Sequence, residues 1–478
     1  MLLLYNYLPF SLKNMSEILL SIVCVYLFFA TMYSCLISFA MLNQKVPPPP
    51  RICEDKIAPF YAYWRVRTFI ALYLGYATFY ITRKNLTPAL HVFSEELNIG
   101  MVDLGIILAV FSLTYGIGKL FSGILADKLN VRFFMAAGLL LSSIINLFYG
   151  FLTSLLLLTF CWGLNGVCQS TGYPPVSKSL VYWFAPRERS KIWSWWSSCQ
   201  TAGTFLVGGL IALLLKFCPD WRAIFYVPGI IGLIVACGLL WALRDTPASV
   251  GLPPIEVYKK EVLPVVLNEQ NHLSRWQVLV KYVFTNPYVW YLSLALSFSY
   301  FIRFATLDWS TKFLYDARGV DKSTVVWLWN LMPLFGVPGG ITAGYLASRF
   351  FKGSCAIVTI SYLLLLSSCI VGYMYFAGEE HLFLTCFFMA AIGFFVDGPL
   401  VLIGGVMLSR VTAKESVAAA AGFSGFWAYA LGTSLGANIG AAWLVEKYGW
   451  NWLYMACIAS SLIAMTLVAV CAKKERPK

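Results

Sequence analysis

Three basic side chains lie inside stretches of the sequence that are otherwise apolar. Arg83, Lys119 and Arg303 each have long runs of hydrophobic residues on both sides. A charged side chain in the middle of a bilayer costs at least about 2.5–3.5 kcal/mol, so such residues face a cavity or a charged partner and mark functional sites. The few acids in comparable positions are Asp308 and Asp397. The apparent excess of positive charge predicts a binding site for an anion.

The chemistry of arginine indicates which anion. A guanidinium presents a planar fork of N–H donors that binds the oxygens of carboxylate or phosphate bidentately. A phosphate monoester carries about −1.5 to −2 charges at pH 7, so it would neutralise two arginines at once. We therefore expect Arg83 and Arg303 to hold one phosphate group, and Arg303→Lys to impair function although it keeps the charge. The alternative for each arginine is snorkelling to an interface or a structural ion pair.

Asp308 and Asp397 each allow two interpretations. Asp308 lies five residues after Arg303, so it is not its i, i+4 partner on a helix. It pairs with Lys119 or with another helix, in a structural or a functional role. Asp397 lies beside a Gly-Pro pair and either balances the charge of the basic site or couples a proton to its function. For Asp397 we expect charge balance.

The composition indicates that these charges lie within a membrane. Hydrophobic residues make up 59% of the 478 residues and charged residues 12%, whereas soluble domains contain about 25% charged residues. The net charge of +13 comes from Lys and Arg scattered between apolar runs. No zinc-finger, helix-turn-helix or RNA-binding signature accompanies them, so nucleic acid is not an expected partner. The lipid bilayer is the expected surroundings.

Motifs for catalysis and for metal binding are absent from the sequence. The 13 cysteines form no CxxC pair and have no metal-ligand spacing, so we interpret them as reduced, buried side chains. His91, His272 and His381 fall in predicted connections and are expected to be solvated. Neither a P-loop nor a zinc-protease or nucleophile-elbow motif occurs. We expect no cofactor, no metal ion and no enzymatic activity.

Twelve apolar stretches follow Lys56, each long enough to cross a bilayer as a helix of ~20 residues. They lie near residues 66–93, 103–126, 133–151, 155–181, 192–215, 221–243, 287–313, 324–347, 354–377, 382–409, 415–443 and 450–472. Most Lys and Arg residues of the connections fall on one side of this layout, together with the C-terminal tail. The positive-inside rule places that side in the cytoplasm. The expected fold class is an all-α integral membrane protein of the cell (inner) membrane.

Residues 1–50 form an N-terminal extension. Residues 17–41 are apolar enough to span the membrane, and the run Pro47–Pro50 behaves as a semi-rigid spacer. Three interpretations compete: an extra helix, an uncleaved signal-like anchor, or a chain whose translation truly begins at Met41. A cleavable signal peptide is disfavoured because no clear small-x-small site follows. We expect a peripheral thirteenth helix that takes no part in the binding chemistry.

Three features recur about 220 residues apart and predict an internal repeat. The sequence GILADK at 123–128 closes the second stretch and GYLASR at 344–349 closes the eighth; Arg83 corresponds to Arg303; a Gly-Pro-type break at 172–175 recurs at 398–399. Parallel six-helix repeats with a substrate site at the midplane between them describe transporters of the major facilitator type, with pseudo-two-fold symmetry. The expected domains are the extension 1–50, a six-helix bundle 51–243, a cytoplasmic central loop 244–286, and a second bundle with a short basic tail 287–478.

Five stretches of the sequence carry a more specific family resemblance. They are Tyr76–Leu86 (YATFYITRKNL), Leu113–Asp127 (LTYGIGKLFSGILAD), Gln169–Pro175 (QSTGYPP), Tyr300–Ser310 (YFIRFATLDWS) and Ala420–Gly425 (AAGFSG). They resemble the organophosphate:phosphate antiporters of the major facilitator superfamily, which exchange glycerol 3-phosphate or hexose 6-phosphate for inorganic phosphate. The pattern G-x-L-A-D-K-x-x-x-R at Gly123–Arg132 is typical of the whole superfamily. The resemblance extends from about Arg65 to the C-terminus.

The resemblance implies a set of site residues. It makes Arg83 and Arg303 the phosphate-binding pair. Five further side chains would surround them: Lys119, Tyr76, Tyr80, Gln169 and Tyr300. Four residues would form a conformational latch at the cytoplasmic ends of helices: Gly123, Asp127, Lys128 and Arg132.

Two positions depart from the family pattern. Gln200 stands where several relatives have a histidine in the fifth span, which argues against a proton-switching role there. Ala421 and Ser424 replace an Asp–Lys pair that some hexose-phosphate carriers have in the eleventh span. The choice of substrate therefore stays open.

These features together predict a monomeric secondary transporter that exchanges a sugar phosphate, with glucose 6-phosphate as first choice, for inorganic phosphate by alternating access. The bound dianion would draw together two halves that repel each other when the site is empty. Three alternatives remain. They are a membrane sensor of hexose phosphate with little flux, a glycerol-3-phosphate:phosphate antiporter, and a proton-coupled symporter of a neutral solute, which leaves the two arginines unexplained.

Overall fold

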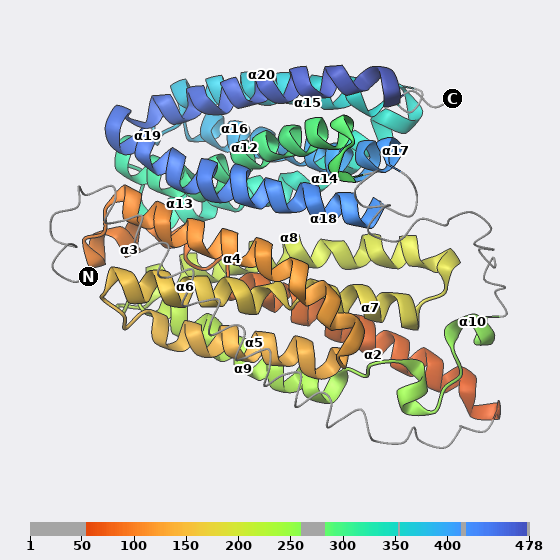
Figure 1. Cartoon of the computed structure of the whole chain (residues 1–478). Coiled ribbons are helices and arrows are strands. Elements are labelled where there is room, and N and C mark those ends of the chain that lie inside the picture. The colour runs from red at the N-terminus through yellow and green to blue at the C-terminus, as the bar shows by residue number, and fades with distance from the viewer. Residues whose placement is uncertain (1–53, 260–282, 352–353, 413–416, 476–478) are drawn as a thin grey trace, which may run out of the picture. The chain divides into compact units, whose positions relative to one another are not determined.

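The computed structural model describes residues 54–259, 283–351, 354–412 and 417–475, and within these ranges the chain forms helices and no strands (Figure 1). The helix expected within residues 17–41 lies outside the described residues. Two long helices, α4 (Met101–Lys128) and α8 (Pro186–Phe217), contribute to both of the compact units into which the chain divides. Unit 1 comprises Met1–Asn85, Ile117–Val207 and Arg222–Leu267, and unit 2 comprises Leu86–Gly116, Gly208–Trp221 and Asn268–Lys478.

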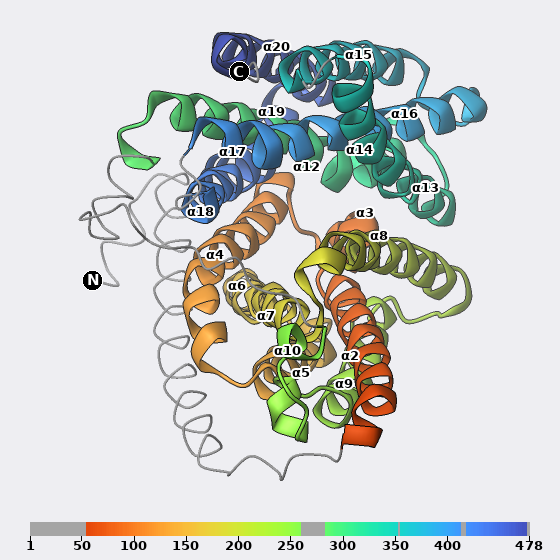
Figure 2. The same cartoon turned by 90° about the vertical axis from the view of Figure 1, so that its right-hand side faces the viewer.

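In its described residues, unit 1 contains five further long helices and two short ones. They are α2 (Glu54–Ile81), α5 (Val131–Tyr149), α6 (Leu155–Ser170), α7 (Tyr173–Trp183), α9 (Ala223–Ala242), the 3-10 helix η3 (Pro247–Val250) and α10 (Ile255–Tyr258). The helix α9 lies beside both α2 and α5 (Figures 1 and 2). The expected break at residues 172–175 is confirmed. The helix α7 begins there with prolines in its first turn, where a missing N–H has no helical partner to lose.

Unit 2 contains the remaining helices. They are η2 (Thr87–Ala89), α3 (Leu90–Leu97), α12 (Pro287–Arg318), α13 (Lys322–Trp329), α14 (Leu331–Arg349), α15 (Cys355–Phe376), α16 (Leu382–Val401), η5 (Leu402–Met407), α17 (Leu408–Val411), α18 (Val417–Trp427), η7 (Ala428–Gly440), α19 (Ala441–Tyr448) and α20 (Trp450–Glu475). The break expected at 398–399 is wrong, because α16 continues through Pro399. Proline lacks the N–H and crowds the carbonyl four residues earlier. The π-helix η5 begins directly after α16 ends.

In its described residues, each of the twelve expected spans coincides with a helix or a run of consecutive helices. The helices are interrupted inside the first span, inside the fourth between α6 and α7, and inside the eighth at Asn330. The helix α2 ends at Ile81, and the chain becomes helical again only at η2. Eight helical stretches of the described residues are long and apolar enough to cross a bilayer. The all-α fold class predicted from the sequence is therefore confirmed, and the chain is a multi-pass integral membrane protein.

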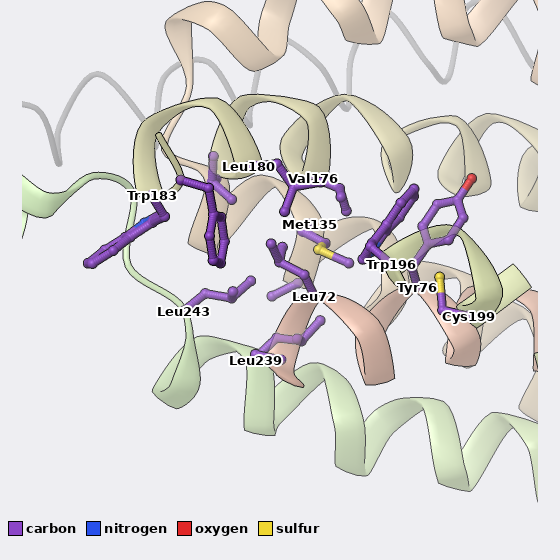
Figure 3. Close-up of a cluster of buried hydrophobic side chains, with 14 of the residues drawn as sticks. Leu72, Tyr76, Met135, Val176, Leu180, Trp183, Trp196, Cys199, Leu239 and Leu243 are labelled. Atoms are coloured by element: carbon purple, nitrogen blue, oxygen red, sulfur yellow. The ribbon is translucent and has the colours of Figure 1, made fainter. Parts of the chain in front are cut away.

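The core of unit 1 fills the space between α2, α5, α7 and α9 (Figure 3). Leu72, Met135 and Leu239 are buried and lie in this cluster. The side chains can meet because α2 presents Gly75 there, where a Cβ would lie 2.9 Å from Met135 and from Leu239. This packing holds the end of α2, and therefore Arg83, in a defined place.

The core of unit 2 depends on a close contact between α14 and α16. A Cβ at Gly339 would lie 1.9 Å from the carbonyl oxygen of Phe394, and one at Gly393 would lie 2.1 Å from that of Met332. Only glycine lets two helix backbones approach this closely. The two helices therefore form a rigid pair behind Arg303.

The prediction that all three histidines are solvated is wrong for His91, which is fully buried in α3. Its ring lies 5.0 Å from the ring of Tyr315, measured between centroids. The short apolar run around η2 and α3 packs inside unit 2 instead of forming an open connection. His381 is exposed as expected, and His272 lies outside the described residues.

Candidate functional site

Arg83 lies in the interruption that follows α2. The N–H of Arg83 donates to the carbonyl of Tyr80 at 3.4 Å, and the N–H of Lys84 donates to the same carbonyl at 3.0 Å. The regular helix therefore ends just before Arg83. An interrupted helix exposes backbone carbonyls that need other donors, because unsatisfied polar groups are costly at membrane depth.

Two side-chain amides supply those donors to the carbonyl of Thr82. Asn146 of α5 donates to it at 2.8 Å, and Asn165 of α6 donates at 3.1 Å. The amide of Gln169 donates to the Thr82 hydroxyl at 2.9 Å. Asn85 ties the other side of the turn to Asn146 at 2.9 Å. All five side chains are at most 2% exposed, so a buried network of neutral hydrogen bonds fixes the turn that carries Arg83.

Most of this network was not among the residues predicted from the sequence. Asn85, Ser142, Asn146 and Asn165 were missed, and Ser142 links the network by donating to Asn165 at 2.6 Å. The available signal was spacing, since Ser142 and Asn146 are four residues apart, as are Asn165 and Gln169. Polar side chains four residues apart in an apolar span share one helix face.

Gln169 was predicted to contact the substrate. The structure places it inside the network, where it donates to Thr82 and, at 2.8 Å, to Ser142. These contacts position the backbone before Arg83. A direct contact of Gln169 with a ligand stays a prediction.

Aromatic side chains surround the guanidinium of Arg83. Its central carbon lies 3.9 Å from the ring centroid of Tyr80, a cation–π distance. The Tyr80 hydroxyl donates to Gln200 at 3.0 Å, so Gln200 holds this ring. Tyr76 packs against Tyr80 with centroids 5.7 Å apart, but it is only 4% exposed.

Lys119 lies near Tyr76 and is linked to it by the ring of Tyr173, a residue that was not predicted from the sequence as part of the site. Its Nζ lies 5.4 Å from the ring centroid of Tyr173, and that ring packs against Tyr76 at 6.3 Å. The chain before Tyr173 passes close to Tyr76 at Gly172, where a Cβ would lie 3.2 Å from the Tyr76 ring. Unit 1 therefore brings Tyr76, Tyr80, Arg83 and Lys119 close to one another, and their contact with a ligand stays a prediction.

Arg303 lies within a continuous helix, α12, and forms an ion pair with Asp397 of α16. Nη1 of the arginine donates to Oδ1 of the carboxylate. The side chain of Arg303 is 34% exposed and that of Asp397 is 19% exposed, so the pair is not sealed inside the protein. The structure shows the charge-balancing contact that the sequence left as one of two possibilities for Asp397.

Two further predicted residues lie on α12 near Arg303. Tyr300 packs against Tyr429 of η7 with ring centroids 5.4 Å apart. Asp308 is 4% exposed, and the segment around it is anchored by Trp309, whose indole donates to the carbonyl of Ala437 at 2.7 Å. Ser424 contacts Ser293 at 2.6 Å between hydroxyls.

The predicted latch lies where α4 ends and α5 begins. Gly123, Asp127 and Lys128 belong to α4, and the structure describes only their backbone. Arg132 is the second residue of α5, and its backbone N–H is capped by the side chain of Asn130 at 3.0 Å. The role of these four residues as a latch stays a prediction, as does the joint binding of one phosphate by Arg83 of unit 1 and Arg303 of unit 2.

Comparisons with known proteins identify the family. Residues 72–396 match the model of the Major Facilitator Superfamily. A probable hexose phosphate transport protein of Chlamydia pneumoniae is 33% identical over 437 residues, which cover 88% of this chain and 94% of the relative. The glycerol-3-phosphate transporter of Bacillus subtilis is 31% identical over 438 residues, covering 90% and 98%. The membrane sensor protein UhpC of Escherichia coli is 33% identical over 437 residues, covering 89% and 96%.

Solved structures agree with this fold. A bacterial homologue of the lysosomal transporter Spinster, in an inward-facing conformation, superposes with a TM-score of 0.62 at 17% identity, covering 86% of this chain and 96% of the other. The nucleoside transporter NupG superposes with a TM-score of 0.64 at 13% identity, covering 86% and 99%. The chain therefore belongs to the major facilitator superfamily, in the group that contains hexose phosphate and glycerol-3-phosphate transport proteins, and it is not an enzyme.

Proposed function

We propose that this protein carries a sugar phosphate, with glucose 6-phosphate as the preferred candidate, across the cell (inner) membrane in exchange for inorganic phosphate. The named functions of its relatives support a phosphate ester as ligand. The observation that carries the proposal is an arginine at the same position of each repeat, each held by neighbours from its own unit. Arg83 follows a turn anchored by buried amides, and Arg303 lies on α12 beside Asp397.

The two arginines explain why exchange would be obligatory. A dianionic phosphate satisfies two guanidinium groups at once, and each group can form two parallel hydrogen bonds with it. Without a dianion the two positive charges repel each other and oppose the approach of the two repeats. Inorganic phosphate shares the charged head of the ester, so either ligand supports reorientation of the site. The protein works as a monomer in this proposal, with its C-terminus in the cytoplasm.

A transport assay with the purified full-length chain tests this function. Liposomes that contain the protein are loaded with inorganic phosphate, and the uptake of labelled glucose 6-phosphate, glycerol 3-phosphate and glucose is followed. We expect uptake of a phosphate ester only when phosphate is present inside. Uptake of glucose driven by a pH gradient would contradict the proposal. The relative rates of the two esters decide which one is preferred.

The similarity to the sensor UhpC supports one other function. A sensor would bind a hexose phosphate with little flux and signal to a partner kinase. The same liposomes distinguish the two functions. Saturable binding of glucose 6-phosphate without exchange would favour the sensor, whereas exchange at many turnovers per molecule favours the transporter.

A further inference from the structure

We infer that Asp397 is a built-in competitor for the guanidinium of Arg303, and that it sets the selectivity of the site for doubly charged ligands. This inference rests on the function proposed above. A phosphate that binds Arg303 competes with the carboxylate of Asp397, which already accepts a hydrogen bond from Nη1. The inference makes Asp397 a specificity-determining residue in addition to a charge-balancing one.

The carboxylate of Asp397 lies directly against the backbone of α14. A Cβ at Gly336 of α14 would lie 2.3 Å from Oδ2 of Asp397 and 3.0 Å from its Cγ. The backbone of α14 therefore forms a wall directly behind the carboxylate, and the glycine contacts between α14 and α16 keep that wall in place. With one oxygen against Gly336 and the other on Arg303, the side chain of Asp397 is directed at the arginine.

Arg303 is the main charged neighbour of the Asp397 carboxylate. Among the described residues of α12, α14 and α15, the charged group that acts on Asp397 is Arg303. Tyr362 of α15 uses its hydroxyl in a contact of 2.8 Å with Thr342 of α14. Asp308 lies five residues further along α12 and is buried. The exchange of partners at Arg303 is therefore a direct competition between Asp397 and the ligand.

Competition of this kind discriminates by charge. A ligand with one negative charge replaces one carboxylate by another and gains little Coulomb energy, while Asp397 is left beside a second anion. A phosphate dianion brings an additional charge and more acceptor oxygens, so it overcomes the loss. The arrangement favours phosphate and phosphate esters over sugars that carry a carboxylate.

Removing the carboxylate tests the inference. We expect Asp397→Asn to bind inorganic phosphate and glucose 6-phosphate about tenfold more tightly than the unmodified protein, because the competitor is gone; tenfold corresponds to about 1.4 kcal/mol. We also expect its preference for glucose 6-phosphate over glucuronate, a sugar of similar size with one carboxylate, to narrow. Dissociation constants are measured by calorimetry on the full-length protein in detergent, together with the melting temperature as a check of folding.

Three further variants separate competition from a structural effect. Gly336→Ala keeps every charge but displaces the carboxylate, so it should also tighten phosphate binding. Asp397→Glu keeps the competitor and should change the affinity less than Asp397→Asn. The matched control is Asp316→Asn, which removes an acid of α12 that forms an ion pair with Lys312 at 2.9 Å, and should leave phosphate affinity unchanged.

The possible outcomes are distinct. Unchanged or weaker phosphate binding by folded Asp397→Asn, with unchanged discrimination against glucuronate, would overturn the inference about Asp397. Failure of the unmodified protein to bind either phosphate compound would instead overturn the proposed function. Should Asp397→Asn fail to fold, Gly336→Ala decides the question, because tighter binding supports competition and unchanged binding contradicts it.

Discussion

Arg83 follows the end of a helix, whereas Arg303 lies in the middle of one. The Arg83 turn is fixed by buried amides from α5 and α6, and the guanidinium lies over the ring of Tyr80. Arg303 is instead paired with an acid, Asp397. Neutral hydrogen bonds fix the position of a charge without reducing it, while an ion pair offsets it. Two positions that look equivalent in the sequence repeat therefore differ in their electrostatics.

This difference suggests a division of labour between the two repeats. The guanidinium of Arg83 lies over the ring of Tyr80, and neutral amides hold the turn that carries it. The arginine held by Asp397 offers its charge only to a ligand that displaces the carboxylate. The affinity for phosphate would depend mainly on Arg83, and the selection of ligands by their charge mainly on Arg303.

The largest expected effect comes from replacing either arginine by lysine. We expect Arg83→Lys and Arg303→Lys each to reduce exchange of glucose 6-phosphate for phosphate about 100-fold, because lysine keeps the charge but cannot form two parallel hydrogen bonds with one phosphate. Exchange in proteoliposomes is the measurement. Full activity of one lysine variant would show that its half of the molecule does not hold the phosphate.

A smaller effect is expected from the network that fixes the Arg83 turn. Asn146→Ala removes one donor from the Thr82 carbonyl, which should lower the free energy of unfolding by about 1–3 kcal/mol. We expect phosphate affinity to fall several-fold as the turn loosens. The control is Asn438→Ala, which removes a buried amide that donates to Ser112 at 3.1 Å in unit 2. An equal loss of phosphate affinity in both variants would contradict a specific role of the network.

The smallest effect is expected at Tyr80. Tyr80→Phe keeps the ring beside Arg83 and removes the hydrogen bond to Gln200, which corresponds to about 1 kcal/mol and a loss of affinity of about fivefold at most. Tyr80→Leu also removes the cation–π contact and should cost more. Dissociation constants for phosphate compare the two variants. The same affinity for both would mean that the ring does not support Arg83.

The sequence alone was sufficient to predict the membrane-spanning helices and the family, and to show that two arginines lie within apolar stretches. Long apolar stretches must form helices in a bilayer, since backbone groups have no other partners there. A charge inside such a stretch is conspicuous for the same reason. Local pattern also predicted the helix break at residues 172–175, where glycine and two prolines interrupt the span.

Other features depended on contacts between helices distant in the sequence. The pairing of Arg303 with Asp397 joins residues 94 positions apart, and sequence spacing does not reveal which face of α16 meets α12. The continuous helix through Pro399 was missed because a Gly-Pro pair usually interrupts a helix, whereas α16 continues through it. The burial of His91 was missed because a short connection was assumed to be open to solvent.

The amino-acid sequence by itself determined that this protein is a helical membrane protein of the major facilitator superfamily, with a span-embedded arginine in each repeat. These properties follow from the hydrophobicity and charge of single segments and do not depend on contacts between helices. The tertiary structure decided that buried amides fix the turn that carries one arginine, and that the other arginine forms an ion pair with a carboxylate. That choice depends on which side chains neighbouring helices bring within hydrogen-bond distance, and only packing determines it.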